Sequence, residues 1–494
     1  MNFFIIKNKL IREESIKSVK KNFIYNFSYQ ILIMILPIVT TPYIARVIGP
    51  EGVGVQSYTY SVANYFVLFA MLGINNHGNR SIAMVRNDEE KLGRTFISIY
   101  LVQFIMSVIM IVLYSVYIMF IAKENKVIFI IQAIYIISAL LDINWFFFGM
   151  EQFKLTVVRN TVIKLASVLS IFIFVRNSND LYLYSLILAL GSLISQCVLW
   201  KYLNKYISFV KVNKKEVLEQ VKPILVLFIP VIAISIYKIM DKIVLGSISS
   251  MVQVGFYENS EKIMNIPLGI ITALGTVMLP KMSNLYAIGN EKEGDKYIEL
   301  SLEFVMFIFI GAMFGLIGIS PVLIPIFLGD KFIDCVNIVS IISITILFLA
   351  WANVIRTQYL IPKKKDKIYI ISTIIGAIIN LVINFLLIKK YGAVGATIGR
   401  IFAEASVCIY QSIMIRKELN IASYLRKVLF YIVPGTVMCI TIRILGNILG
   451  KSIITGIIQV ISGGVLYVVL CLIYMILIKN EIVINAIERF LKRV

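Results

Sequence analysis

Long apolar segments recur along almost the whole 494-residue chain, and they restrict its fold more than any other feature. A helix needs about 20 apolar residues to cross the roughly 30 Å hydrocarbon core of a bilayer. Only 15% of the residues are charged, whereas about 25% are charged in an ordinary soluble domain. The sequence therefore predicts an all-α polytopic membrane protein and excludes a soluble domain with a single anchor.

The apolar segments predict about 14 transmembrane helices. These are expected at residues 23–47, 55–75, 95–121, 127–148, 156–175, 181–200, 223–246, 256–279, 298–319, 337–359, 368–388, 393–415, 428–446 and 453–478. Of the 48 Lys and Arg residues, 33 are assigned to the two tails and the connections after even-numbered helices, and 9 to the other connections. Because cytoplasmic loops carry an excess of Lys and Arg, both termini are expected in the cytoplasm.

The longest internal connection, residues 201–222, is basic and divides the first twelve helices into two sets of six. A weak internal repeat agrees with this division, because a glycine-assisted turn is expected at three equivalent corners. These corners are Arg46–Gly49 before Val53–Tyr58, Lys242–Gly246 before Val254–Tyr257, and Tyr391–Ala396. Paired helix bundles of this kind are common in secondary transporters. We therefore predict two pseudo-symmetric six-helix lobes around a central cavity, residues 1–205 and 206–420, with two extra C-terminal helices in residues 421–494.

Motifs for catalysis or cofactor binding are not found in the sequence. His77 is the single histidine, and the five cysteines are scattered without a CxxC spacing. Neither a metal site nor a disulfide framework is implied, and no Walker motif indicates nucleotide hydrolysis. The formal net charge of +21 is attributed to cytoplasmic loops rather than to nucleic-acid binding. We expect no cofactor, no metal and no enzymatic activity.

The segment Leu36–Val55 resembles the first-helix signature of bacterial polysaccharide repeat-unit flippases. These are the Wzx-type members of the multidrug/oligosaccharidyl-lipid/polysaccharide exporter superfamily. Further matching pieces follow in the same order: Gly78–Ala83, Phe148–Lys154, Asp241–Gly246, Val254–Tyr257, Leu279–Pro280, and Gly392–Arg400 with Glu404. The resemblance spans nearly the whole chain.

The resemblance implies transport of an undecaprenyl-pyrophosphate-linked oligosaccharide across the bacterial plasma membrane by alternating access, for capsule, O-antigen or exopolysaccharide synthesis. The implied partners are this anionic lipid-linked oligosaccharide, membrane lipids, a polysaccharide polymerase and other assembly proteins, but no nucleic acid. Two alternatives stay open. One is a cation-coupled multidrug exporter of the same superfamily, and the other is a membrane-embedded polysaccharide polymerase or glycosyltransferase.

Ionisable side chains inside the apolar segments are the candidate substrate ligands. Each costs about 2.5–3.5 kcal/mol at the centre of a membrane helix, so such groups normally face a cavity or a partner. The candidates are Lys164, Lys238, Asp241, Lys242, Lys262, Arg356, Arg400 and Glu404, together with Asp142 and with Arg46 at an outer corner. Without Arg46, six are basic and three are acidic. This excess of positive charge suits a pyrophosphate.

Structural roles compete with the binding roles for most of these residues. Arg400 and Glu404 are four residues apart and are equally compatible with an ion pair on one helix face. Lys238 and Asp241 are three apart and allow the same reading. Lys242, Lys262, Arg356 and Arg46 lie near helix ends or in a loop, where long side chains reach the membrane interface. Lys164 lies in the middle of its segment, which favours the cavity role.

Polar amides, glycines and prolines complete the set of candidates. The amides Asn26, Gln30, Asn64, Asn380 and Asn384 suit sugar hydroxyls, but they suit hydrogen bonds between helices equally well. Gly395 and Gly399 form a GxxxG step, which favours close helix packing. Pro37, Pro230 and Pro267 are expected to kink the helices that contain them.

Overall fold

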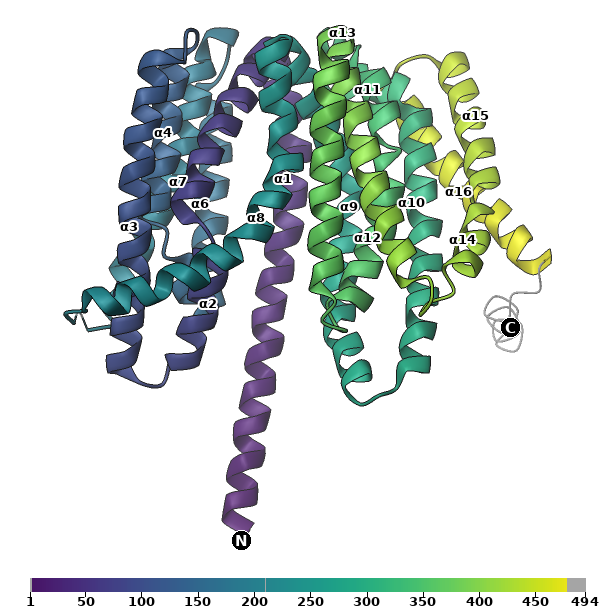
Figure 1. Ribbon diagram of the computed structural model, residues 1–494. Coiled ribbons are helices and arrows are strands. Elements are labelled where there is room, and N and C mark those ends of the chain that lie inside the picture. Colours follow the sequence, from purple (N-terminus) through teal and green to yellow (C-terminus); the bar gives the residue numbers. More distant parts are fainter. Residues whose placement is uncertain (1, 209, 478–494) are drawn as a thin grey trace. The chain divides into compact units, whose positions relative to one another are not determined.

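The computed structural model describes residues 2–208 and 210–477, without the side chains of residues 2–31, 34, 237, 238, 273 and 276. Every regular element in this part of the chain is a helix (Figure 1). The helices are α1 (Asn2–Met71), α2 (Ile74–Val85), α3 (Glu89–Phe120), α4 (Lys126–Leu140), α5 (Asn144–Gly149), α6 (Phe153–Phe174), η1 (Ser178–Asp180), α7 (Leu181–Leu203), α8 (Lys214–Ile248), α9 (Met251–Ala287), α10 (Glu291–Phe327), η2 (Asp330–Phe332), α11 (Cys335–Ile342), α12 (Thr345–Ile355), the π-helical turn η3 (Arg356–Leu360), α13 (Asp366–Ile415), α14 (Ile421–Leu429), α15 (Ile432–Leu449) and α16 (Ile453–Leu477).

Each of the 14 predicted segments falls on one helix or on consecutive helices. By length and composition, 10 helices in the described part of the chain are able to cross a membrane, or 11 when the bent helix α9 counts as one span. This number is smaller because α13 carries two predicted segments and α1 is not among the helices counted. The prediction of an all-helical polytopic membrane protein is confirmed.

Two of the three predicted glycine corners are present as sharp breaks inside long helices. Gly49 in α1 has φ +77°, and Gly392 in α13 has φ +54°. With ψ at 176° and −129°, both residues adopt backbone angles that are essentially restricted to glycine and cost other residues about 1–3 kcal/mol, which explains glycine at both corners. The third corner is different, because Gly246 lies inside α8 and Ser250 caps α9 by accepting a hydrogen bond from the Gln253 amide at 3.4 Å.

The three prolines expected to kink helices lie inside helices, but the bend in α9 is further along the helix than Pro267, where it was predicted. Pro37, Pro230 and Pro267 lie within α1, α8 and α9. The axis of α9 bends by 40° between residues 272 and 277. A proline ring clashes with the carbonyl four residues earlier, and Pro280 therefore accounts for a bend at this position better than Pro267 does.

The chain divides into two compact units, Met1–Ile239 and Met240–Val494, with the boundary inside α8. In unit 1, α3 and α7 both pack against α4, α6 packs against α7, and α1 contacts α3, α4 and α6 (Figure 1). The segments Gly78–Ala83 and Phe148–Lys154, which carry part of the family resemblance, lie on α2 and at the end of α5, and these two helices pack closely. A Cβ atom on Gly78 would lie 2.4 Å from the Trp145 ring, and one on Gly149 would lie 2.7 Å from the Ile82 side chain. Glycine is needed at both positions because α2 and α5 pack at this short distance.

The first half of α8 is anchored on unit 1 by polar contacts and by close backbone packing. His77 Nε2 lies 2.7 Å from Gln220 Oε1, and Arg94 Nη1 lies 3.2 Å from Glu216 Oε1. A Cβ atom on Gly73 would lie 2.3 Å from the carbonyl oxygen of Ile224. Backbone atoms thus set the spacing between α8 and the start of α2.

Replacing Gly73 by alanine is expected to destabilise unit 1 by about 1–3 kcal/mol, the usual cost of overpacking. The added methyl group has to displace backbone atoms of α8, which a change of side-chain rotamer does not relieve. The measurement is the midpoint of thermal unfolding in detergent. Gly464→Ala is the control, because no atom lies within 4 Å of the added methyl group. Equal midpoints for the two variants would contradict the packing described here.

Unit 2 is built around α9 to α13. Helices α11, α12 and α13 pack against α9, and α10 contacts α9, α11 and α12. The last two helices, α15 and α16, pack on each other and on α10, at the edge of the unit (Figure 1). After α13, the Glu418 carboxylate accepts hydrogen bonds from Lys365 and Tyr359, and these bonds lower the pKa of Glu418. They connect the two ends of the long α13 hairpin.

Candidate functional site

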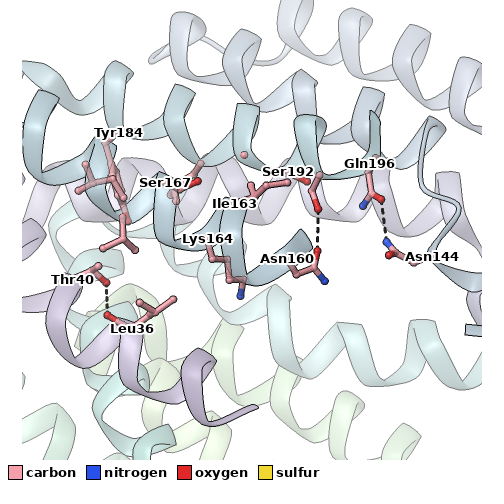
Figure 2. A pocket seen from close by; sticks show the side chains of 15 residues that line it. Leu36, Thr40, Asn144, Asn160, Ile163, Lys164, Ser167, Tyr184, Ser192 and Gln196 are labelled. Atoms are coloured by element: carbon pink, nitrogen blue, oxygen red, sulfur yellow. Dashed lines mark hydrogen bonds between the residues drawn. The ribbon is translucent and has the colours of Figure 1, made fainter. Parts of the chain in front are cut away.

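A polar pocket with a volume of about 420 Å³ lies within unit 1, between α1, α5, α6 and α7 (Figure 2). Its lining combines amides and hydroxyls with one lysine and several aliphatic side chains, and no carboxylate is among these residues. The lining residues are Leu36, Thr40, Asn144, Asn160, Ile163, Lys164, Ser167, Val168, Ile171, Tyr184, Leu188, Gly191, Ser192, Ser195 and Gln196. Such a lining offers hydrogen bonds and one positive charge.

Lys164 is the cation of this pocket. It lies near the middle of α6, it is half-buried, and its ammonium group extends into the space between α6 and α1 (Figure 2). Asn160 precedes it by one helical turn and therefore shares its face of the helix. Lys164 was singled out from the sequence because of its central position in an apolar segment.

Arg159 contacts two residues that line the pocket, and it was missed as a site residue. It was counted among the Lys and Arg residues of the cytoplasmic connections although the predicted segment 156–175 contains it; in the structure it lies on α6, which begins at Phe153, and it is only 6% exposed. Its Nη2 donates to Asn144 Oδ1 and to Asn160 Oδ1, both at 2.8 Å. The sequence signal that could have identified it is the spacing of Arg159, Asn160 and Lys164 on neighbouring turns.

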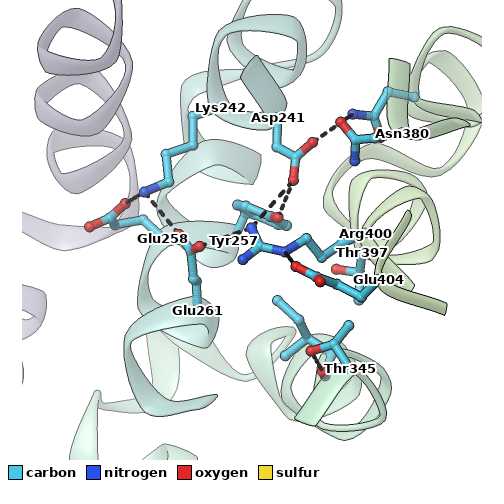
Figure 3. Close-up of polar contacts among 12 residues, drawn as sticks. Asp241, Lys242, Tyr257, Glu258, Glu261, Thr345, Asn380, Thr397, Arg400 and Glu404 are labelled. Atoms are coloured by element: carbon cyan, nitrogen blue, oxygen red, sulfur yellow. Dashed lines mark hydrogen bonds and ion pairs between the residues drawn. The ribbon is translucent and has the colours of Figure 1, made fainter. Parts of the chain in front are cut away.

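A second polar cluster lies within unit 2, where three helices bring charged side chains together (Figure 3). Its members are Asp241 and Lys242 from α8, Tyr257, Glu258, Glu261 and Lys262 from α9, and Asn380, Asn384, Arg400 and Glu404 from α13. Five of these residues, Asp241, Lys242, Lys262, Arg400 and Glu404, were predicted as candidate ligands. The structure shows them in contact with one another or with their neighbours in the cluster.

Arg400 is the centre of this cluster and is 4% exposed. Its Nη1 lies 3.1 Å from Glu261 Oε1 and 3.8 Å from Asp241 Oδ2. Its Nε lies 3.5 Å from Glu404 Oε1, so the pair at a spacing of four residues is present. A buried guanidinium that meets three carboxylates acts as an internal counter-ion.

Asp241 is fully buried and is held by neutral donors as well as by Arg400. The Tyr257 hydroxyl donates to Asp241 Oδ2 at 2.6 Å, and Asn384 Nδ2 donates to Asp241 Oδ1 at 2.7 Å. Asn384 also donates to Asn380 Oδ1 at 3.2 Å. The structure therefore supports bonding between helices for Asn384, which joins α13 to α8, while Asn380 accepts a hydrogen bond from Asn384 within α13.

Lys242 and Lys262 contact two glutamates that the sequence analysis did not select. Lys242 Nζ lies 2.5 Å from Glu258 Oε2 and 2.9 Å from Glu261 Oε2, and Lys262 Nζ lies 3.1 Å from Glu258 Oε1. Four carboxylates thus meet three cations in this cluster. The predicted excess of positive charge does not hold in this cluster, because the candidate set left out Glu258 and Glu261, which lie inside the predicted segment 256–279.

Arg46 and Arg356 are not members of the pocket or of the polar cluster, and three other predicted side chains lie outside the described residues. Arg46 is exposed on α1, three residues before the Gly49 corner. The Arg356 guanidinium lies 5.5 Å from the ring centroid of Tyr369, in a cation–π contact at the end of α12. The side chains of Lys238, Asn26 and Gln30 lie outside the described residues.

A family model described as "Polysaccharide biosynthesis protein" matches residues 19–286, more than half of the chain. The chain belongs to this family. Its predicted membership of the repeat-unit flippases is thereby confirmed, and the protein is a membrane transporter rather than an enzyme.

Individual relatives agree with the family model. A protein of Shigella dysenteriae named "Putative O-antigen transporter" is 25% identical over 79% of this chain and 98% of its own length. The "Capsular polysaccharide biosynthesis protein CapF" of Staphylococcus aureus is 26% identical over 76% of this chain and 94% of its own length. Among solved structures, "Lipid II flippase MurJ, inward closed conformation" has a TM-score of 0.73 at 16% identity and covers 93% of this chain and 99% of that one. This likeness shows a shared fold.

Proposed function

We propose that this transporter moves an undecaprenyl-pyrophosphate-linked oligosaccharide repeat unit across the bacterial plasma membrane by alternating access, for capsule, O-antigen or exopolysaccharide synthesis. The names of the relatives support this assignment, because they refer to O-antigen transport and to capsular polysaccharide synthesis. Alternating access further assumes that the two lobes predicted from the sequence, residues 1–205 and 206–420, open in turn to the two sides.

The pocket of unit 1 is the observation that carries the proposal. Hydroxyls such as those of Ser167 and Ser192 are suited to sugar hydroxyls, because both groups donate and accept hydrogen bonds. The Lys164 ammonium is suited to phosphate oxygens, with which charged hydrogen bonds are about twice as strong as neutral ones. A drug exporter for cationic compounds would need a carboxylate in the same place, and the lining residues include none.

Transport of a fluorescently labelled lipid-linked oligosaccharide in reconstituted vesicles tests the proposal directly. Vesicles that contain the protein should move the label to the opposite leaflet faster than empty vesicles do, and the donor lipid should be recovered uncleaved. Cleavage or extension of the glycan would instead indicate a glycosyltransferase or polymerase. Export of cationic dyes without movement of the glycolipid would indicate a drug exporter.

The orientation of the chain is part of this proposal. We expect both termini and the connection that contains Lys211 in the cytoplasm, and the connection that contains Ser249 outside, because of the distribution of Lys and Arg. Both residues are exposed. In a background without the five native cysteines, a membrane-impermeant maleimide applied to whole cells should label Ser249→Cys and not Lys211→Cys. The reverse pattern would contradict this orientation.

A further inference from the structure

We propose that Asp142 and Arg159 orient the amides of Gln196 and Asn160 so that the pocket of unit 1 presents hydrogen-bond donors to an anionic group of the substrate. This inference rests on the proposed function, since it names the part of the substrate that this pocket recognises. It makes Gln196 and Asn160 ligands of that group, and Asp142 and Arg159 positioning residues.

The chain of hydrogen bonds begins at the Asp142 carboxylate. Its Oδ1 accepts from the Asn144 backbone amide at 2.9 Å and from Asn144 Nδ2 at 2.7 Å. An ionised carboxylate only accepts hydrogen bonds. The amino group of the Asn144 side chain must therefore face Asp142, and its carbonyl oxygen must face the other way.

Arg159 fixes the other end of the same amide. Its Nη2 donates to Asn144 Oδ1 at 2.8 Å, and a guanidinium has donors only. The second hydrogen of Asn144 Nδ2 is given to Gln196 Oε1 at 3.0 Å. Because Gln196 Oε1 already accepts a hydrogen bond from Asn144, the amino group of Gln196 is the part of this amide that can donate to a ligand in the pocket.

Asn160 is oriented in the same sense by two donors. Arg159 Nη2 at 2.8 Å and the Ser195 hydroxyl at 3.0 Å both donate to Asn160 Oδ1. The amino group of Asn160 is then the side of the amide left for a ligand, one turn before Lys164 on α6 (Figure 2). These residues come from three separate segments of unit 1, so the orientation arises from the fold and not from local sequence.

The result is a pocket wall with two amide amino groups and one ammonium group. A neutral sugar hydroxyl gains little from such a one-sided arrangement, since it also seeks acceptors. A group with acceptor oxygens only, a phosphate or a carboxylate, matches all three donors. In a lipid-linked glycan this group is either the pyrophosphate or the carboxylate of an acidic sugar.

Binding measurements on the full-length protein in detergent separate these cases. The probes are undecaprenyl pyrophosphate, undecaprenol, a glucuronate-containing oligosaccharide and a neutral glucose oligosaccharide. Gln196→Glu and Asn160→Asp keep the shape and replace a donor by an acceptor. Each should weaken binding of the recognised anionic probe by about tenfold to a hundredfold, which is the loss of affinity that follows from losing one hydrogen bond to a charged group. Binding of the matched neutral probe should change little.

Controls and positioning variants complete the experiment. Asn125→Asp, in an exposed connection, adds the same negative charge and should leave all affinities unchanged. Asp142→Asn should lower the ratio of anionic to neutral binding, because an amide can also donate and the Asn144 amide is then oriented by Arg159 alone. A change in unfolding temperature without a change in this ratio would refute the positioning role of Asp142. Unchanged anion binding in both pocket variants would overturn the inference even if the vesicles transport the glycolipid. Selective anion binding without transport would leave the inference standing and refute the proposed function.

Discussion

Replacing Arg400 by glutamine should destabilise unit 2 by about 3–5 kcal/mol, the usual cost of removing one partner from a buried ion pair. Arg400 is 4% exposed and contacts the carboxylates of Asp241, Glu261 and Glu404. Without the guanidinium, these groups are left buried and close together without their shared cation. The measurement is thermal unfolding of the detergent-solubilised protein.

Two further variants make this test specific. Arg426→Gln changes an exposed arginine on α14 and should alter stability by no more than about 0.5 kcal/mol, as surface substitutions do. Adding Glu261→Gln to Arg400→Gln should recover part of the lost stability, because it removes one of the carboxylates left without the guanidinium. The free-energy changes of two substitutions in one ionic network are not additive. A stability of Arg400→Gln equal to that of Arg426→Gln would show that the cluster does not depend on this counter-ion.

Replacing Lys164 by glutamine should slow glycolipid transport in vesicles by about tenfold or more, since one charged hydrogen bond is removed from the substrate. We also expect the transport rate to depend on the membrane potential. An anion that leaves a negative compartment gains about 2.3 kcal/mol per charge and per 100 mV. If the Lys164 charge crosses part of the field when the empty carrier returns, the same potential favours that step as well.

The measurement uses a potassium gradient with valinomycin, without a sodium or proton gradient. Transport should accelerate when the side that donates the substrate is negative, and Lys164→Gln should reduce both the rate and its dependence on voltage. Lys154→Gln, an exposed lysine on the same helix, is the matched control. Transport that ignores the potential and requires sodium or protons would contradict this mechanism and would direct attention to Asp142, Asp241 or Glu404 as ion-binding residues.

The charges in unit 2 limit how much positive charge the empty carrier can contribute. Lys242, Lys262 and Arg400 all contact carboxylates, so they add little net charge to a moving element. The voltage dependence that we expect therefore rests mainly on Lys164, which makes the Lys164 variant the decisive one.

Predicting the individual helices required only local information. In a bilayer each spanning segment has to satisfy its own backbone hydrogen bonds, so a run of about 20 apolar residues is sufficient to indicate a helix. The Gly49 and Gly392 corners were also predictable, because only a short local motif is needed to turn the chain. The break between α4 and α5 was not predicted, because in the sequence Asp142 and Asn144 look like any polar residues near a helix end. Only the structure shows that the Asp142 carboxylate accepts a hydrogen bond from the Asn144 backbone amide there.

By itself, the sequence determined that this protein is an all-helical membrane transporter with Lys164 in the middle of a span. Only the tertiary structure decided which charges are paired and which line the pocket. Glu258 meets Lys242, and Arg159 meets Asn144, across helices whose rotation about their own axes no hydrophobic run specifies. A segment that is apolar on nearly all sides has no periodic pattern to show which face is buried. The partners of its few polar residues are therefore fixed by packing between helices and not by their spacing along the chain.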